Sequence, residues 1–218
     1  MAPYRQVADL PQLIPVFPLD GALLLPGGEL PLQIFEPRYL NMVDDVMAGD
    51  RIIGMIQTRG GGRSNPRLAE VGCAGRITSY NETSDGRYLI TLTGICRFEA
   101  GEELDLRLPY RQLRARYDRF GDDLDRDERA VAGEKARARF AKALKRYLNH
   151  RELDIDWETA NDAPLEALVN SLCMGLPFEP AEKQAFLEAP DLAGRFEVLT
   201  TLLEIDASDP DDERAQLQ

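Results

Sequence analysis

Residues 13–40 read LIPVFPLDGALLLPGGELPLQIFEPRYL, and this stretch decides the architecture of the first half of the chain. Its apolar residues fall into three segments, 13–19, 23–25 and 30–35, which proline and glycine residues separate. Proline lacks the amide donor of a sheet ladder and glycine adopts positive φ, so these breaks force turns or strand edges. The stretch therefore predicts a strand, a bend and a second strand.

A short helix is predicted directly after the second strand. Pro37 suits the first helical position, because its missing amide hydrogen would have no partner there in any case. Leu40, Val43 and Met47 then repeat at helical spacing. Together these residues predict a helix from Pro37 to about Ala48.

Strand patterns continue along the chain as far as Tyr117. Apolar runs and alternating residues predict further strands at 52–56, 68–82, 88–99 and 110–117, with the hairpin signal Asp85-Gly86 between two of them. Several short strands separated by turn signals are typical of a closed or nearly closed β architecture.

The second half of the chain has the composition of helices. Residues 126–149 are rich in Ala, Arg, Lys and Glu, which are good helix formers. Pro164, Glu179-Pro180 and Asp191 mark the starts of three further predicted helices. Beyond Glu204 the chain is acidic and almost free of apolar residues, which predicts a disordered tail.

Charge is divided unequally between the two halves. The formal net charge is −12. Residues 1–116 hold 13 arginines and 14 acidic residues, whereas residues 117–218 hold 13 basic and 24 acidic residues. This change in composition predicts a boundary near residue 117. A strongly acidic half repels phosphate backbones, so nucleic acid is a disfavoured partner.

Four sequence segments resemble one known family, in the family's order. They are IPVFPLDGALLLPGGELPLQIFEPRY at 14–39, VGCAGRI at 71–77, LTGICRF at 92–98, and EKQAFLE at 182–188 followed by Asp191, Arg195 and Leu199. Together they resemble the N-terminal domain of Lon, the ATP-dependent protease La. The resemblance covers residues 13–206.

The resemblance implies an α+β fold, in which a PUA-like β pseudo-barrel with one short helix precedes a helical bundle. We expect an N-terminal arm at 1–12, the β domain at 13–120, the helical domain at 121–206 and an acidic disordered tail at 207–218. Full-length Lon proteases carry a Walker ATPase module and a Ser–Lys protease domain, and this sequence contains neither motif set. A stand-alone, non-catalytic form is therefore expected.

The family implies binding of protein substrates. We accordingly expect unfolded or client polypeptides as partners, a cellular protease as a further partner, and an adaptor role in protein degradation. The apolar turn-rich residues Leu23, Leu24, Leu25 and Pro26 could hold an extended peptide if they are exposed, by apolar contact or strand addition. The alternative is that these leucines pack inward.

The start of the predicted helix offers polar candidates for the same role. Helix starts attract acidic groups, and Arg38 would add to that attraction. Glu36 and Asn41 lie beside it, although all three residues could equally be a cap and its neighbours.

Two rival functions remain open. PUA-like folds can bind RNA, and four arginines could form a stripe for it: Arg111, Arg114, Arg116 and Arg119. The second rival is an enzyme with an unrecognised site, of which a conceivable Ser–Lys dyad of Ser171 and Lys183 is one example. The interpretation of Ser171 as a hydroxyl inside a helix competes with that role.

No metal or cofactor site is predicted. Cys73, Cys96 and Cys173 are widely spaced, His150 is the single histidine, and a structural zinc site takes four such ligands. Three reduced, buried thiols are the expected state. No apolar run approaches the ~18–20 residues that cross a bilayer. The first residues lack the apolar centre of a signal peptide, so a cytoplasmic protein without membrane contact is expected.

Overall fold

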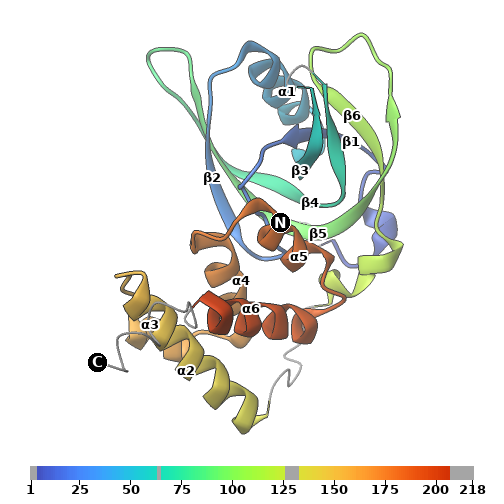
Figure 1. Cartoon of the computed structure of the whole chain (residues 1–218). Helices are drawn as coiled ribbons and strands as arrows, with labels where there is room; N and C mark the ends of the chain where they lie inside the picture. Colours follow the sequence, from blue (N-terminus) through green and yellow to red (C-terminus); the bar gives the residue numbers. More distant parts are fainter. Residues whose placement is uncertain (1–3, 63–64, 126–132, 207–218) are drawn as a thin grey trace.

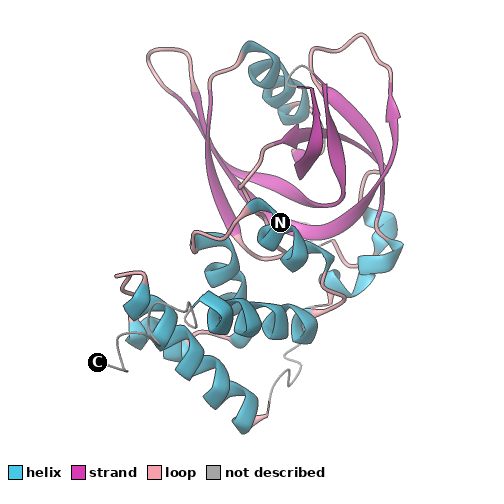
Figure 2. Cartoon of the chain, in the orientation of Figure 1, coloured by secondary structure: helices cyan, strands magenta, loops and turns pink. Residues whose placement is uncertain are grey.

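A curled sheet occupies the first half of the chain and helices occupy the second half (Figures 1 and 2). This computed structural model describes residues 4–62, 65–125 and 133–206. The strands are β1 (Leu13–Pro18), β2 (Glu29–Ile34), β3 (Ile52–Gly62), β4 (Asn65–Glu82), β5 (Tyr88–Leu104) and β6 (Arg111–Arg116). The helices are η1 (Val7–Asp9), α1 (Pro37–Met47), η2 (Asp118–Leu124), α2 (Glu134–His150), α3 (Trp157–Asp162), α4 (Leu165–Gly175), α5 (Pro180–Glu188) and α6 (Leu192–Asp206).

The six strands form one mixed sheet in the order β2-β5-β4-β3-β1-β6. β1 and β3 run parallel, and every other pair is antiparallel. β6 pairs with both β1 and β5, so the sheet curls back on itself. β4 and β5 are long enough to bend round the core, and their ladder shifts register after Ala74 and after Ile77. β2 pairs with β5 alone and is an edge strand among the described strands.

Helix α1 lies at the end of the sheet away from the helical half (Figure 1). Its buried side chains include Tyr39, whose ring packs against Phe17 with centroids 4.2 Å apart. Asp44 and Asp45 on the other side of α1 accept hydrogen bonds from the hydroxyls of Tyr88 and Tyr110, at 3.0 and 2.6 Å. The prediction of a helix beginning at Pro37 is confirmed.

The helical half packs around α6. α2 lies along α6, where the rings of Phe140 and Phe196 are 5.0 Å apart, and α4 and α5 also contact α6. Apolar residues of the helices join those of the sheet in one continuous core. The predicted α+β class is confirmed.

Arg97 of β5 connects the two halves through buried hydrogen bonds. Its guanidinium is 2% exposed and holds the Asp123 carboxylate through Nε and Nη2, at 2.9 and 2.8 Å. Its Nη1 also donates to the carbonyls of Leu187, at 3.0 Å, and Ala189, at the end of α5. One side chain thus joins the sheet, η2 and the turn between α5 and α6.

The apolar segment Leu23–Leu25 belongs to no strand and lies in the connection between β1 and β2. The change from strands to helices after β6 passes through the 3-10 helix η2, in which Phe120 is buried and Asp123 is bound by Arg97. The predicted tail at 207–218 lies outside the described residues, as do residues 1–3 of the arm.

Candidate functional site

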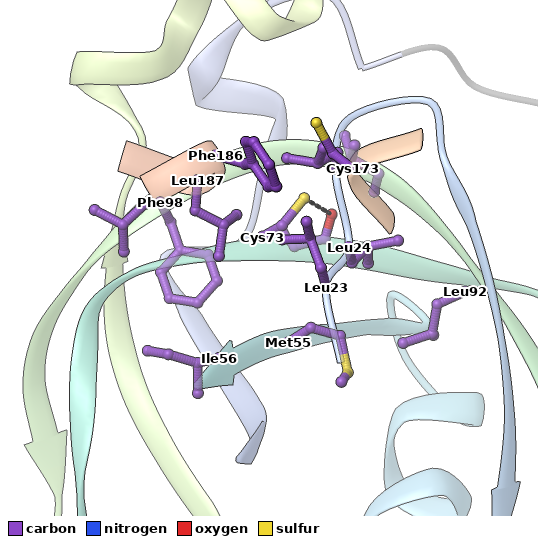
Figure 3. Packing of buried hydrophobic residues seen from close by; sticks show 14 of the residues in the cluster. Leu23, Leu24, Met55, Ile56, Cys73, Leu92, Phe98, Cys173, Phe186 and Leu187 are labelled. Carbon is purple, nitrogen blue, oxygen red and sulfur yellow. Dashed lines mark hydrogen bonds between the residues drawn. The ribbon is translucent and has the colours of Figure 1, made fainter. Parts of the chain in front are cut away.

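The apolar segment Leu23–Pro26 is buried, so the expectation that it forms an exposed strip is wrong. Leu23, Leu24 and Leu25 are 2%, 1% and 0% exposed, and Pro26 is also buried. Figure 3 shows Leu23 and Leu24 among side chains of the strands and of the helical half. The leucines therefore belong to the core between the two halves.

Close backbone contacts hold this segment inward. Gly27 has a φ of 77°, and its amide donates to the carbonyl of Gly94 at 2.9 Å. A Cβ added to Gly94 would lie 2.0 Å from the carbonyl oxygen of Leu25, so only glycine permits this approach. The carbonyl of Pro26 accepts a hydrogen bond from Asn170 Nδ2 of α4 at 2.9 Å. The segment is thus fixed from both sides.

A buried arginine supports the same contact from α6. Arg195 is 2% exposed and donates from Nη1 to Asn170 Oδ1 at 3.0 Å and from Nε to the carbonyl of Phe186 at 3.2 Å. Burial lowers the pKa of Arg195 from its ordinary value. Arg195, Asn170 and the Pro26 carbonyl therefore form a buried chain of hydrogen bonds that connects α6, α4 and the segment Leu23–Pro26.

The polar residues at the start of α1 are accessible. Arg38 pairs with Glu36 at 2.8 Å, and both side chains remain about half exposed, at 51% and 44%. The Arg38 guanidinium also lies 4.5 Å from the centre of the Tyr39 ring. Asn41 is exposed one turn later. These three candidates share one surface, whereas the leucines do not reach it.

Phe35 adds an apolar side chain to that surface. It is 62% exposed and stands between β2 and α1. Glu29, Pro31 and Gln33 are exposed at alternate positions before it, so Phe35 continues the outward face of β2. Leu89 of β5 is 41% exposed and pairs with Gln33. Neither Phe35 nor Leu89 was predicted as a site residue, although the alternation from Glu29 contained the signal for Phe35. We call Phe35, Glu36, Arg38, Asn41 and Leu89 the β2–α1 surface.

The edge of β2 is an incomplete template for another strand. An unpaired edge can accept an extended peptide through its backbone groups. Pro31 interrupts this edge, because proline supplies no amide donor. Contact with side chains such as Phe35 is therefore better supported than a continuous added strand.

Each arginine of the stripe considered for RNA binding lies beside a glutamate side chain. Arg111 binds Glu103 at 2.6 Å, and Arg114 lies 4.0 Å from Glu102. Glu99 serves the other two arginines, Arg116 and Arg119, at 3.8 and 3.5 Å. The four side chains accordingly offer little free positive charge.

The two residues considered for a Ser–Lys dyad have different surroundings. Lys183 donates from Nζ to the carbonyl of Gly21 at 2.7 Å, and Ser171 is exposed on α4. The described residues contain no group of three or more His, Cys, Asp or Glu side chains suited to a metal ion. Within the same residues, no helix has both the length and the apolar character needed to cross a bilayer.

A family model described as the ATP-dependent protease La (LON) substrate-binding domain matches residues 13–204. This chain belongs to the Lon substrate-binding domain family. Lon protease 2 of Myxococcus xanthus is 28% identical to this Lon-family chain over 202 residues, which are 89% of the chain and 24% of that protease. The Lon protease of Anaeromyxobacter dehalogenans is 26% identical over 203 residues, or 89% and 23%. The chain thus spans about a quarter of the length of these curated relatives.

Solved structures share the fold. The N-terminal domain of the Mycobacterium avium complex Lon protease is 18% identical, with a TM-score of 0.62 over 90% of this Lon-family chain and 98% of that one. A Lon N-terminal domain protein from Xanthomonas campestris is 23% identical, with a TM-score of 0.59 over 87% and 97%. At 18% and 23% sequence identity, the similarity to these two structures shows a shared fold and nothing about function.

Proposed function

We propose that this chain is a non-catalytic domain that binds unfolded or client polypeptide and presents it to a cellular protease. The observation that carries the proposal is the match of the Lon substrate-binding model to residues 13–204. Because Leu23–Leu25 are buried, recognition requires a surface outside the core.

The β2–α1 surface is the proposed place of contact. Phe35 and Leu89 supply apolar area, and unfolded chains offer apolar side chains that native surfaces hide. Arg38 and Glu36 supply polar groups beside it. The net charge of −12 favours basic clients, and added salt should weaken that preference through screening.

The test compares two forms of one basic client. Lysozyme that has been reduced and alkylated stays unfolded, and native lysozyme is its folded counterpart. The chain should bind the unfolded form and not the native form. Burying a phenylalanine side chain contributes roughly 1.5–3 kcal/mol, so Phe35→Asp should weaken binding about tenfold or more.

Ile205 provides a matched control for this substitution. It is 64% exposed, close to the 62% of Phe35, but lies on α6 in the helical half. Ile205→Asp should leave the affinity for unfolded lysozyme unchanged, and both variants should keep the parental melting temperature. If a folded Phe35→Asp variant binds unfolded lysozyme as tightly as the parent protein does, the β2–α1 surface is not the binding site. An absent preference for the unfolded client would refute the function itself.

A further inference from the structure

Basic side chains gather on α2, in a chain whose formal net charge is −12. The 17 residues of α2, EKARARFAKALKRYLNH, hold six lysines and arginines and one acidic residue. Three of the chain's four lysines lie there, at positions 135, 142 and 145. The fourth, Lys183, is half-buried and bonded to the Gly21 carbonyl. The exposed lysines among the described residues are therefore confined to one helix.

Four of these cations form a stripe along α2. Lys135, Arg139, Lys142 and Arg146 follow one another at spacings of four, three and four residues, which is one face of an α-helix. Three turns make this stripe about 16 Å long. The other face of α2 is buried in the core beside α6, through Phe140, Ala143, Leu144, Tyr147 and Leu148. The stripe consequently points away from the core.

Most of the positive charge on α2 is not neutralised within the described residues. Arg139 is the exception, because it pairs with Glu204 at 2.7 Å and Glu197 at 3.0 Å. The other cations of α2 are exposed and have no ion-pair partner in the described parts of the chain: Lys135, Arg137, Lys142, Lys145 and Arg146. Like charges at this spacing repel one another. A bound anionic partner would relieve that repulsion.

We propose that the outer face of α2 docks an acidic helical segment of a partner protein. Carboxylates at the same helical spacing on the partner would meet the unpaired stripe cations Lys135, Lys142 and Arg146, as charged positions do between paired helices. Ala138 and Ala141 are exposed on the outer face of α2. Such small side chains let a second helix approach closely, since interaxial distance follows side-chain size.

Other anionic partners fit this face less well. A duplex spreads its phosphates over a surface wider than this single row of cations, so some of them would meet Glu197 and Glu204, which border the stripe. An anionic membrane would require bulky apolar residues among the cations. The exposed apolar residues on this face of α2 are the two alanines. A partner helix carries its carboxylates in one row as narrow as the stripe, and small side chains between the cations are enough for its approach.

The test uses a synthetic helical peptide of about 16 residues, whose glutamates repeat at i, i+4, i+7 and i+11. It should bind the full chain at low salt and dissociate as salt is raised. Carbodiimide should join its carboxylates to Lys135, Lys142 and Lys145, and leave Lys183 unlinked. Reversing three charges, in Lys135→Glu/Lys142→Glu/Arg146→Glu, should weaken binding by at least about tenfold, because three surface ion pairs are lost.

A matched triple variant separates this face from net charge. Arg67→Glu/Arg87→Glu/Arg107→Glu makes the same charge change at exposed arginines of the sheet half and should bind the peptide nearly as the parent does. Equal weakening in both triples would overturn the proposal, as would equal binding of a peptide with the same composition and scattered glutamates. Tighter binding of duplex DNA, or of phosphatidylserine vesicles, would assign the face to a different partner. None of these results bears on the β2–α1 surface, which Phe35→Asp tests separately.

Discussion

At the scale of single residues, the three cysteines are enclosed by the core. Cys73, Cys96 and Cys173 are each 0% exposed and unpaired. Burial raises the pKa of Cys96 and of Cys173 from 9.0 to about 12, and raises that of Cys73 well above its ordinary value. A thiol that is both buried and protonated reacts slowly with electrophiles. We therefore expect no rapid reaction with an aromatic disulfide reagent until the protein is denatured.

The same pKa shifts predict a loss of stability in alkali. Because the folded state retains thiol protons that the unfolded state releases, the stabilisation is complete below the unfolded pKa of 9.0 and is lost as pH rises towards about 12. Tyr110 acts in the same direction, since burial and its bond to Asp45 raise its pKa to about 12. Guanidinium midpoints measured across this range should fall steadily. A constant midpoint would contradict the assigned burial.

Single residues also explain what the sequence could reveal of the candidate site. Phe35 was predictable, since the alternation from Glu29 places it on the outward face of β2. Leu24 was not, because three consecutive leucines have no alternation that indicates a face. Its burial depends on Gly75, whose added Cβ would lie 2.5 Å from Leu24, and on Asn170 far along the chain. Such contacts have no local signal.

At the scale of elements, the buried ion pair between Arg97 and Asp123 connects η2 to β5. Arg97 and Asp123 are 2% and 10% exposed, so removing one partner leaves a buried charge without compensation. We expect Arg97→Met to lower the free energy of unfolding by about 3–5 kcal/mol. The double variant Arg97→Met/Asp123→Leu should lose less than the sum of the two single variants.

An exposed pair of similar geometry serves as the control for this cycle. Arg139 and Glu204 lie 2.7 Å apart, but their side chains are 45% and 41% exposed. Solvent screens such a pair, so Arg139→Met should change the denaturation midpoint little. A similar loss at both pairs would show that burial does not set the strength of the Arg97–Asp123 contact.

At the scale of the whole molecule, the order and type of most helices and strands could be predicted from hydrophobic periodicity and from the residues that begin helices. Pro37 and Pro180 begin α1 and α5 as their pattern predicted. The short helices η2 and α3 were not predicted, because propensity is weak over so few residues. The packing of the two halves also lacked a sequence signal, since it depends on polar side chains such as Arg97 and Arg195 buried by distant segments.

The contacts between the halves predict that the chain unfolds in one transition. Arg97 ties β5 to the end of α5, and Asn170 of α4 holds the Pro26 carbonyl, so loss of either half exposes unpaired polar groups in the other. Trp157, the single tryptophan, lies in the helical half, and the Cys73 thiol lies in the sheet half. Tryptophan fluorescence and thiol reactivity should therefore change together across a guanidinium titration. Arg97→Met removes one of these contacts, so the midpoints of the fluorescence and thiol-reactivity curves should lie further apart than in the parent protein. Distinct midpoints in the parent protein would mean that the halves unfold independently and that the buried contacts between them contribute little.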